Sequence, residues 1–453
     1  MDRPVTDTAA MPGSLQRRDG ARPFVLIDGL NLSLERGTGV ATYGRNLSSN
    51  LRDLGCEVGV LYGGAFSAGR SPLLREVLFF DSQYASVNLW QLTRRTVRST
   101  LAPRWNTAFE VPMSGAVVSR ALASGLPHYD TIWNARDLYF KAATQFNVFG
   151  AINRVRMSRK PDLCHWTYPL PLKLPSVPNV YTLHDLVPLR LPYTTLDRKE
   201  RYFRLLEWIC RTAAHIITVS EHSKRDIVEL LGVDPARVTN TYQAVTIADE
   251  HRLKPEEEVQ RDVEGIFGLP YREYFLFFGS LEPKKNIGRI IEGYLASAVE
   301  APLVMVGARA WKSKYELKLL QTDDGRTQLS PQAASRIVRL EYAPFPLLVS
   351  LIRGAKAVLF PSLYEGFGLP ILEAMVLGTP VLSSNTSSVP EVAGNAALLV
   401  SPYDTRAIAD GVRALDADDD LRADLSERGR RRAALFSEAA YRERLAAVYR
   451  RVL

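Results

Sequence analysis

Cysteine is scarce in this sequence, and its scarcity argues against two kinds of architecture. The three cysteines, Cys56, Cys164 and Cys210, are scattered over 453 residues, and none belongs to a CxxC pair. This spacing argues against a disulfide framework and against a cysteine-based metal site. It is typical of a protein from a reducing compartment, so we expect a cytoplasmic location.

Long hydrophobic runs are also missing. No apolar stretch approaches the roughly 18 to 20 residues that span a bilayer. The first twenty residues lack the apolar core of a secretory signal. We therefore predict that residues 1–20 form a disordered leader and that any contact of the chain with a membrane is peripheral.

Several catalytic signatures are absent as well. The sequence has no Walker phosphate loop, no GxGxxG after its first expected strand and no GxSxG elbow of a serine hydrolase. Its histidines form no pair at a zinc-like spacing with a third partner; they are His128, His165, His184, His215, His222 and His251. We therefore predict no metal ion and no bound cofactor.

Positive charge is concentrated in one segment. The formal net charge of the chain is +8. Residues 91–160 hold eleven Lys and Arg and three Asp and Glu, and this difference of +8 equals the net charge of the whole chain. Within this segment, WQLTRRTVRSTLAPRW, residues 90–105, mixes basic and apolar side chains like a surface-seeking amphipathic segment. A solvated helix face is an equally good interpretation. Because the basic balance is local and no binding motif is present, we expect no nucleic-acid partner.

Alternating strands and helices organise the first half of the chain. PFVLIDGLNL, residues 23–32, is a short apolar run that ends in turn residues, as expected of a buried parallel strand. A glycine-containing loop and a helix follow over residues 37–55, and CEVGVLYG is the next strand. Residues 65–160 are irregular, and the α/β pattern returns from Cys164. This order predicts a doubly wound α/β domain over residues 21–245, with ligands at the carboxyl ends of its strands.

A second α/β series occupies the other half. Residues 246–263 are rich in charge and contain little that could build a core, so we place an interdomain linker there. Five short apolar segments follow at spacings that leave room for helices: EYFLFFGSL, PLVMVGA, RIVRLEYA, KAVLFPS and TPVLSS. We predict a second Rossmann-like domain over residues 264–435 and an amphipathic C-terminal helix over residues 436–453 that could pack on either half.

The stretch PSLYEGFGLPILEAMVLGTPV, residues 361–381, carries the strongest functional signal. A strand ends there, a loop with Gly366 and Gly368 follows, and a helix begins directly afterwards. Glycines allow the backbone to approach a ligand closely, and the free N–H groups of a helix start favour phosphate. Glu365 precedes the loop and Glu373 lies after the helix start. Both are hydrogen-bond acceptors, which suits sugar and ribose hydroxyls because these are donors.

Each glutamate alone has a simpler interpretation, as a solvated carboxylate or as one that favours a helix start. Together, with seven residues between them, Glu365 and Glu373 resemble the glutamate pair of the retaining glycosyltransferases of family 4. The resemblance extends from about residue 24 to about residue 435, and YEGFGLP-ILEAM is its most specific part. It implies a GT-B fold, an α/β architecture in which two Rossmann-like domains with parallel sheets face an interdomain cleft.

The resemblance also implies roles for residues of the second half. Glu365 would contact the donor hexose as a catalytic residue, and Glu373 would bind the ribose. Lys285 would offset the charge of the departing nucleoside diphosphate. Four loop residues would surround the sugar and the diphosphate: Gly366, Phe367, Gly368 and Leu369.

One position departs from the family pattern. In FFGSLEPKKNI, residues 277–287, many relatives carry an arginine just after the glycine, where this chain has Ser280. Lys284, Arg289 or Arg309 could supply the missing positive charge. Taken alone, two lysines in a loop are more often exposed to solvent than bound to a ligand.

Two segments of the first half contribute to the resemblance. TLHDLVPL is similar to the family segment whose histidine touches the donor sugar near the reacting carbon, which makes His184 the second expected catalytic residue, with Asp185 beside it. The loop GTGVATYGRNL is similar to the family's first glycine loop, so Gly37, Gly39 and Arg45 are candidates for the floor of the cleft. Without the resemblance, a lone histidine would more often be structural.

The resemblance implies hexosyl transfer from a nucleotide sugar with retention of anomeric configuration. TLHDLVPL, VSEHSKRDI and GSLEPKKN together most resemble bacterial mannosyltransferases that build O-antigen or exopolysaccharide. GDP-mannose is therefore the expected donor, and the expected acceptor is a saccharide, typically carried on a polyprenyl diphosphate. A UDP-sugar donor stays open, as do a nonhydrolysing epimerase, a phosphorylase and an inactive sugar-nucleotide-binding subunit. Residues 91–160 would hold the enzyme peripherally on the anionic inner face of the plasma membrane.

Overall fold

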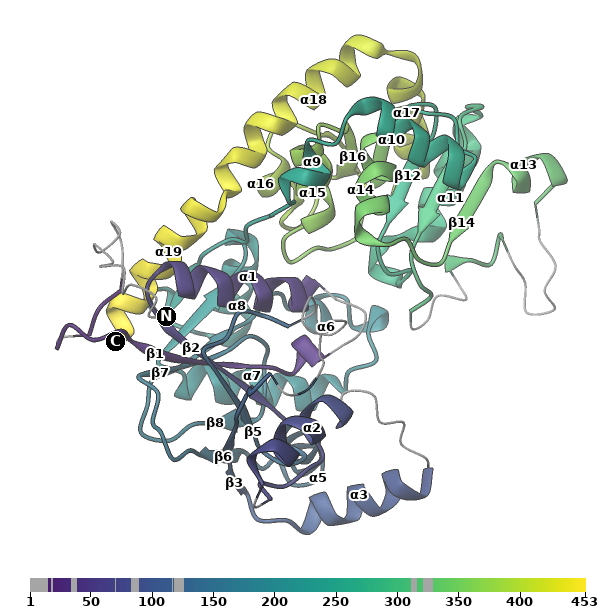
Figure 1. The fold of residues 1–453 in the computed structure, drawn as a ribbon. Coiled ribbons are helices and arrows are strands. Elements are labelled where there is room, and N and C mark those ends of the chain that lie inside the picture. Colours follow the sequence, from purple (N-terminus) through teal and green to yellow (C-terminus); the bar gives the residue numbers. More distant parts are fainter. Residues whose placement is uncertain are drawn as a thin grey trace.

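The chain folds into two α/β domains, which lie one above the other in Figure 1. The computed structural model describes residues 15–17, 19–33, 39–69, 71–82, 89–115, 117, 126–310, 316–320 and 329–453. The strands of the two large sheets that lie between two others are short and almost entirely buried, as expected of strands covered on both faces.

The N-terminal domain is built on an eight-stranded sheet with the order β11-β10-β9-β7-β1-β2-β5-β4. Its strands are β1 (Phe24–Asp28), β2 (Glu57–Tyr62), β4 (Phe109–Val111), β5 (Thr131–Asn134), β7 (Leu163–Trp166), β9 (Asn179–Thr182), β10 (His215–Thr218) and β11 (Val238–Asn240). All neighbours are parallel except β4, which is antiparallel to β5. The helices are α1 (Gly39–Asp53), α2 (Pro72–Ser82), α3 (Leu89–Leu101), α5 (Leu138–Phe149), α6 (Val187–Arg190), α7 (Lys199–Thr212) and α8 (Glu221–Leu231).

The irregular part of the sequence, residues 65–160, contains regular structure that its pattern does not reveal. It provides α2, α3 and α5 and two strands of the large sheet. It also provides two of the three strands of a small parallel sheet, formed by β3 (Trp105–Thr107), β6 (Asn153–Arg156) and β8 (Leu172–Lys173). These strands are two to four residues long, so each carries too little periodicity to be recognised.

The C-terminal domain is a parallel six-stranded sheet with helices around it. The strand order is β14-β13-β12-β15-β16-β17, with β12 (Phe275–Phe278), β13 (Leu303–Val306), β14 (Ile337–Leu340), β15 (Ala357–Phe360), β16 (Val381–Ser384) and β17 (Leu398–Val400). The helices are α9 (Asp249–Arg252), α10 (Glu256–Arg261), α11 (Ile287–Ser297), α13 (Pro331–Ser335), α14 (Phe345–Arg353), α15 (Leu369–Leu377), α16 (Val389–Ala393), α17 (Thr405–Ala417), α18 (Asp419–Ala433) and α19 (Glu438–Val452). The five predicted strands are present, and β17 is a sixth.

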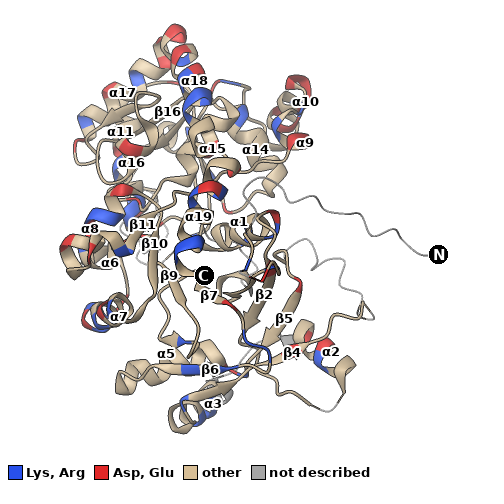
Figure 2. Ribbon diagram, turned by 90° about the vertical axis from the view of Figure 1, so that its left-hand side faces the viewer, with Lys and Arg blue, Asp and Glu red and all other residues tan. Residues whose placement is uncertain are grey.

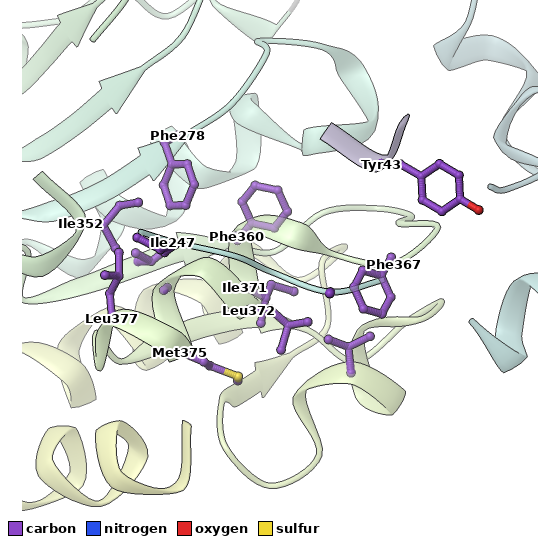
Figure 3. Packing of buried hydrophobic residues seen from close by; sticks show 14 of the residues in the cluster. Tyr43, Ile247, Phe278, Ile352, Phe360, Phe367, Ile371, Leu372, Met375 and Leu377 are labelled. Atoms are coloured by element: carbon purple, nitrogen blue, oxygen red, sulfur yellow. The ribbon is translucent and has the colours of Figure 1, made fainter. Parts of the chain in front are cut away.

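A buried hydrophobic cluster fixes α15 against the C-terminal sheet. Figure 3 shows this cluster, in which Phe278 and Phe360 come from the sheet and Ile371 and Leu372 from α15. Ile371 and Leu372 are fully buried. Because α15 begins at the end of the loop that carries Glu365, this packing positions the loop relative to the carboxyl ends of the strands.

The predicted linker differs from the observed segment. Residues 246–263 form α9 and α10 and enter a π-helical turn (Asp262–Ile266). Val259 and Val263 are fully buried in the core, and the Ser350 hydroxyl donates to Asp262 at 2.6 Å. These two side chains, one helical turn apart, anchor the charged segment together with the buried Ile247.

Both ends of the described chain pack on the N-terminal domain. Leu15 is buried, and its N–H donates to the carbonyl of Leu54 at 2.8 Å; the predicted disordered leader, residues 1–20, therefore ends in packed structure, while residues 1–14 lie outside the described residues. Helix α19 crosses from the C-terminal domain to the N-terminal domain (Figure 1). There the Tyr449 hydroxyl lies 2.7 Å from Nδ1 of the buried His165.

None of the helices in the described part of the chain combines the length and the apolar character that crossing a bilayer requires.

Candidate functional site

Glu365 lies in an anchored loop between β15 and α15. Its N–H donates to the Ser387 hydroxyl at 3.0 Å. The Ser388 hydroxyl donates to the carbonyl oxygens of Glu365 at 2.9 Å and Phe367 at 3.0 Å. The Glu365 residue is buried. These bonds fix the orientation of the loop.

Lys285 and Glu365, eighty positions apart in the sequence, form a buried ion pair. The Lys285 Nζ donates to Oε1 of Glu365 at 2.8 Å and lies 4.7 Å from the centre of the Phe360 ring. Asn286 ties the lysine loop to the end of β15, because its side chain donates to the carbonyl of Pro361 at 2.9 Å. Burial alone would raise the pKa of Glu365, but the charges of Lys285 and its neighbour outweigh it and hold the pKa below the ordinary value. Glu365 is therefore ionised at neutral pH.

Glu373 is a half-buried carboxyl group on α15. Burial raises its pKa to about 7, and the charge of Lys285 offsets only part of that shift. Its side chain makes no hydrogen bond or ion pair with any residue that the structure describes. A group that titrates near neutral pH and has unused acceptor oxygens is suited to bind a ligand that brings its own hydroxyl donors.

The start of α15 leaves backbone N–H groups free beside Glu365. Gly368 is the N-cap residue, with φ +107°, and no side chain caps the helix. Within the described chain the N–H groups of Gly368 and Leu369 have no hydrogen-bond partner, and the helix dipole makes such groups favourable for an anion. The Phe367 ring is buried against Tyr242 and Phe436, with centroids 6.2 Å and 5.6 Å away. Phe367 can therefore contribute only its backbone to a donor site.

The residues that could replace the family arginine lie in different places. The Ser280 hydroxyl donates to Oε1 of Glu282 at 3.3 Å. Arg289 donates to the side chain of Asn286 at 3.1 Å, and Arg309 is exposed, with its backbone bridged to that of Leu281.

Lys284 is the alternative whose charge acts on Glu365. Burial works to lower the pKa of Lys284, but the negative charges of Asp185, Glu365 and Glu282 outweigh it and raise the pKa. The ammonium group is therefore held charged between the two domains. It is the best placed of the three cations to bind a phosphate.

His184 follows β9 and is held in one orientation. Its Nε2 donates to the carbonyl of Thr167 at 2.9 Å, which leaves Nδ1 as a hydrogen-bond acceptor when the ring is neutral. The Tyr43 ring packs edge-on against it, with centroids 4.8 Å apart. Burial lowers the pKa of His184, so the imidazole is neutral at physiological pH.

The loop with Glu365 touches the His184 segment directly. A β-carbon at Gly366 would lie 2.9 Å from the carbonyl oxygen of His184 and 3.0 Å from Oδ2 of Asp185. The Ser223 hydroxyl of α8 also donates to the Gly366 carbonyl at 3.3 Å. Only glycine allows this approach, so the structure brings the expected catalytic residues of both domains into one region.

Residues at the start of α1 reach the same region. A β-carbon at Gly39 would lie 3.6 Å from a methyl group of Leu369, which places the start of α1 beside the start of α15. Arg45 is half-buried on α1. Gly37 lies outside the described residues.

Some residues of this region could not be found from the sequence. Tyr43, Thr167 and Ser388 position His184 and the Glu365 loop, as described above. Glu391 of α16 accepts hydrogen bonds from the N–H groups of Glu221 at 2.7 Å and His222 at 3.0 Å, so a carboxylate of the C-terminal domain occupies the start of α8. No spacing in the sequence links these residues. The contacts of Tyr43, Thr167 and Ser388 depend on how loops pack within one domain, and those of Glu391 depend on how the two domains meet.

The described residues include no group of three or more His, Cys, Asp or Glu that could hold a metal ion; the absence of a metal in the reaction stays a prediction. The arrangement can bind an anionic group with Lys284, Lys285 and two N–H groups. It can also accept hydrogen bonds from hydroxyl groups with Glu365, Glu373 and Nδ1 of His184.

Comparison with protein families gives two matches in tandem. Residues 37–249 match the family described as Glycosyltransferase Family 4. Residues 268–432 match the family described as Glycosyl transferases group 1. The two matches cover the N-terminal and C-terminal domains in turn.

Two curated relatives are O-antigen mannosyltransferases. O-antigen chain mannosyltransferase B of Escherichia coli is 34% identical over 265 residues, which are 57% of this chain and 66% of that protein. O-antigen chain mannosyltransferase RfbU of Salmonella typhimurium is 27% identical over 274 residues, which are 58% of this chain and 67% of that protein. The chain thus matches about two thirds of the length of each.

Solved structures share the two-domain architecture. The Anabaena protein HepE, crystallised with UDP, superposes with a TM-score of 0.62 at 15% identity, over 95% of this chain and 100% of that one. The fold is therefore GT-B, as predicted.

Proposed function

Because this chain belongs to the glycosyltransferases that join a family 4 domain to a group 1 domain, we propose that it transfers mannose from GDP-mannose to a lipid-linked saccharide. The transfer retains the anomeric configuration, needs no bound metal and serves surface polysaccharide synthesis. The names of the two O-antigen mannosyltransferase relatives support this choice of sugar and pathway. The observation that carries the proposal is the Lys285–Glu365 pair beside Gly366, which touches the His184 segment.

The donor site follows from the charges around this pair. The diphosphate of the donor is placed against Lys284, Lys285 and the free N–H groups at the start of α15, which offset the charge that develops as it leaves. The hexose hydroxyls donate to Glu365, and the ribose hydroxyls donate to Glu373. Neutral His184 accepts a hydrogen bond from the sugar at Nδ1. We assign no protein nucleophile.

In the transfer step the bond between the anomeric carbon and the diphosphate breaks, and a bond to the acceptor oxygen forms on the same face. The leaving diphosphate takes the proton of the acceptor hydroxyl. Contact between the Glu365 loop and the His184 segment excludes water that would otherwise hydrolyse the donor.

We also propose that the basic segment, residues 91–160, contacts the membrane surface. Arg94 and Arg98 of α3 are exposed beside Val97 and Leu101, which are 55% and 80% exposed. Figure 2 shows α3 at the end of the N-terminal domain that lies away from the C-terminal domain. Exposed apolar side chains flanked by arginines match an anionic lipid surface, which corresponds to the inner face of the plasma membrane.

A transfer assay tests the proposal. Purified protein is incubated with GDP-mannose, with and without membrane extract that contains lipid-linked saccharide, and GDP release and product mass are measured. We expect acceptor-dependent GDP release and a product heavier by one hexose. Glu365→Gln should lower the rate by about 10²-fold, as for other transition-state contacts. Release of nucleotide without acceptor, together with an altered sugar, would instead indicate an epimerase, and activity only with UDP-sugars would overturn the choice of donor.

A further inference from the structure

The N-terminal domain contains a cavity that the donor site does not use. Its volume is about 780 Å³. It lies at the carboxyl edge of the sheet, since Tyr62 ends β2 and Tyr168 follows β7. Its walls are mainly aromatic and apolar side chains from α5, α7 and the strand-end loops, among them Tyr139, Phe140, Phe146, Tyr168, Tyr202 and Leu205. Such a lining with a few polar groups is typical of a small-molecule site.

Two arginines that have no partner among the described residues line the cavity. Arg198, the N-cap residue of α7, and Arg201, on its first turn, line both this cavity and an adjoining hollow of about 540 Å³. Neither guanidinium makes an ion pair or hydrogen bond with the part of the chain that the structure describes. Arg95, which also lines the cavity, is by contrast paired with Asp137 at 2.7 Å. Asp197 is the one acidic residue of the described lining, so the lining as a whole carries a net positive charge.

The cavity also adjoins the reacting region. The Tyr202 hydroxyl donates to the carbonyl of Asp185 at 3.5 Å, and Asp185 is the neighbour of His184. Burial raises the pKa of Tyr168 to about 12, and the nearby charge of Lys284 opposes this shift. A ligand in the cavity would therefore reach from the two arginines to the side chains that surround the expected donor.

We propose that this cavity binds the acceptor, as a saccharide whose diphosphate is bound by Arg198 and Arg201. This inference rests on the proposed function, in which the acceptor is lipid-linked. The saccharide lies along the aromatic walls with its reacting hydroxyl near Tyr168 and Tyr202. The two guanidinium groups can bind phosphate oxygens in the bidentate manner that arginine allows.

The adjoining hollow gives the lipid chain a way out. Besides the two arginines it is lined by Asn147 and Val148, at the end of α5. Val148 and Phe149 are 57% and 56% exposed. An isoprenoid chain leaving the diphosphate would thus pass over apolar side chains next to α3, which packs against α5 and carries the proposed membrane surface.

The first test measures binding and does not depend on catalysis. Geranyl diphosphate, a short isoprenoid diphosphate, is titrated into the full-length protein by calorimetry. The double variant Arg198→Ala/Arg201→Ala should bind it at least tenfold more weakly than the wild type. The control is Arg204→Ala/Arg211→Ala, which removes the same charge from exposed positions of α7 and should bind like the wild type. No binding by the wild type, or equal weakening in both double variants, would overturn the inference.

The second test separates the diphosphate from the saccharide. For transfer from GDP-mannose, Arg198→Ala/Arg201→Ala should raise the KM for the diphosphate-linked acceptor at least tenfold. It should leave the rate with the methyl glycoside of the same saccharide and the Kd of GDP-mannose unchanged. An equal loss with the methyl glycoside would contradict a diphosphate site. Absence of any transfer by the wild type, with geranyl diphosphate still bound through the two arginines, would count against the proposed function alone.

Discussion

Replacing Glu373 with glutamine should stabilise the unliganded protein above pH 7 and weaken donor binding. Burial raises the pKa of this carboxyl group from 4.5 to about 7, and its side chain has no partner among the described residues to compensate. Because the folded chain holds the proton more tightly than the unfolded chain, the associated stability is fully present below pH 4.5 and is lost as the pH rises through about 7. Glutamine keeps the shape and removes the charge.

The size of the effect follows from the pKa difference. A rise from 4.5 to about 7 corresponds to roughly 3 kcal/mol for a group shielded from water. The side chain is only half-buried, so solvent reduces the value to about 1–3 kcal/mol. Urea unfolding should show this gain for Glu373→Gln at pH 8.5 and no gain at pH 4.5. The exposed Glu257 provides the matched control, because Glu257→Gln should change stability at neither pH.

Donor binding should also release a proton from Glu373. Ribose hydroxyls that donate to the carboxylate favour its ionised form, so at pH 7 a bound donor should displace about half a proton per molecule. Calorimetric titration of GDP-mannose in buffers of different ionisation enthalpy measures this number directly. The Glu373→Gln variant should release about half a proton less and bind about 1–3 kcal/mol more weakly. Equal proton release and equal affinity in both proteins would refute the role of Glu373.

Three further changes test other parts of the structure. Lys285→Ala leaves the buried Glu365 carboxylate without its ion pair and should cost about 3–5 kcal/mol in urea unfolding, whereas Lys285→Ala/Glu365→Gln should cost less; equal costs would contradict a tight pair. Gly366→Ala should lower kcat at least tenfold with little change in donor affinity, because its methyl group would push the domains apart; an unchanged kcat would show that this contact is dispensable. Arg94→Ser/Arg98→Ser should reduce sedimentation with anionic liposomes but not with neutral ones, and equal sedimentation would leave α3 as a solvated helix.

The sequence was sufficient to predict many strands of the two large sheets, because these strands are short apolar runs between glycines and helical patterns. It did not predict the shortest strands, nor the helices of residues 65–160, where proline, glycine and basic residues interrupt the apolar pattern. β17, Leu398–Val400, has three half-buried residues, and the small sheet pairs Trp105–Thr107 with Asn153–Arg156, far away in the chain. The charged segment 246–263 has few apolar residues, and Ile247, Val259 and Val263 are buried and anchor it.

The site was predictable only in part, and for a similar reason. The spacing of Glu365 and Glu373 and the glycines between them are local features, so a motif can reveal them. The ion pair with Lys285 joins two loops of one domain, and the hydrogen bond that orients His184 comes from the carbonyl of Thr167. Contacts of this kind depend on the packing of strand ends, which no sequence spacing encodes.

The most direct test of the central claim compares two ligands that differ only in the hexose unit. GDP-mannose and GDP are titrated into the wild type and into Glu365→Gln. If Glu365 holds the donor hexose, the variant should bind GDP-mannose at least tenfold more weakly, about 1.4 kcal/mol. It should bind GDP as tightly as the wild type or more tightly, because Lys285 is no longer paired with a carboxylate. Unchanged affinity for GDP-mannose would contradict the claim.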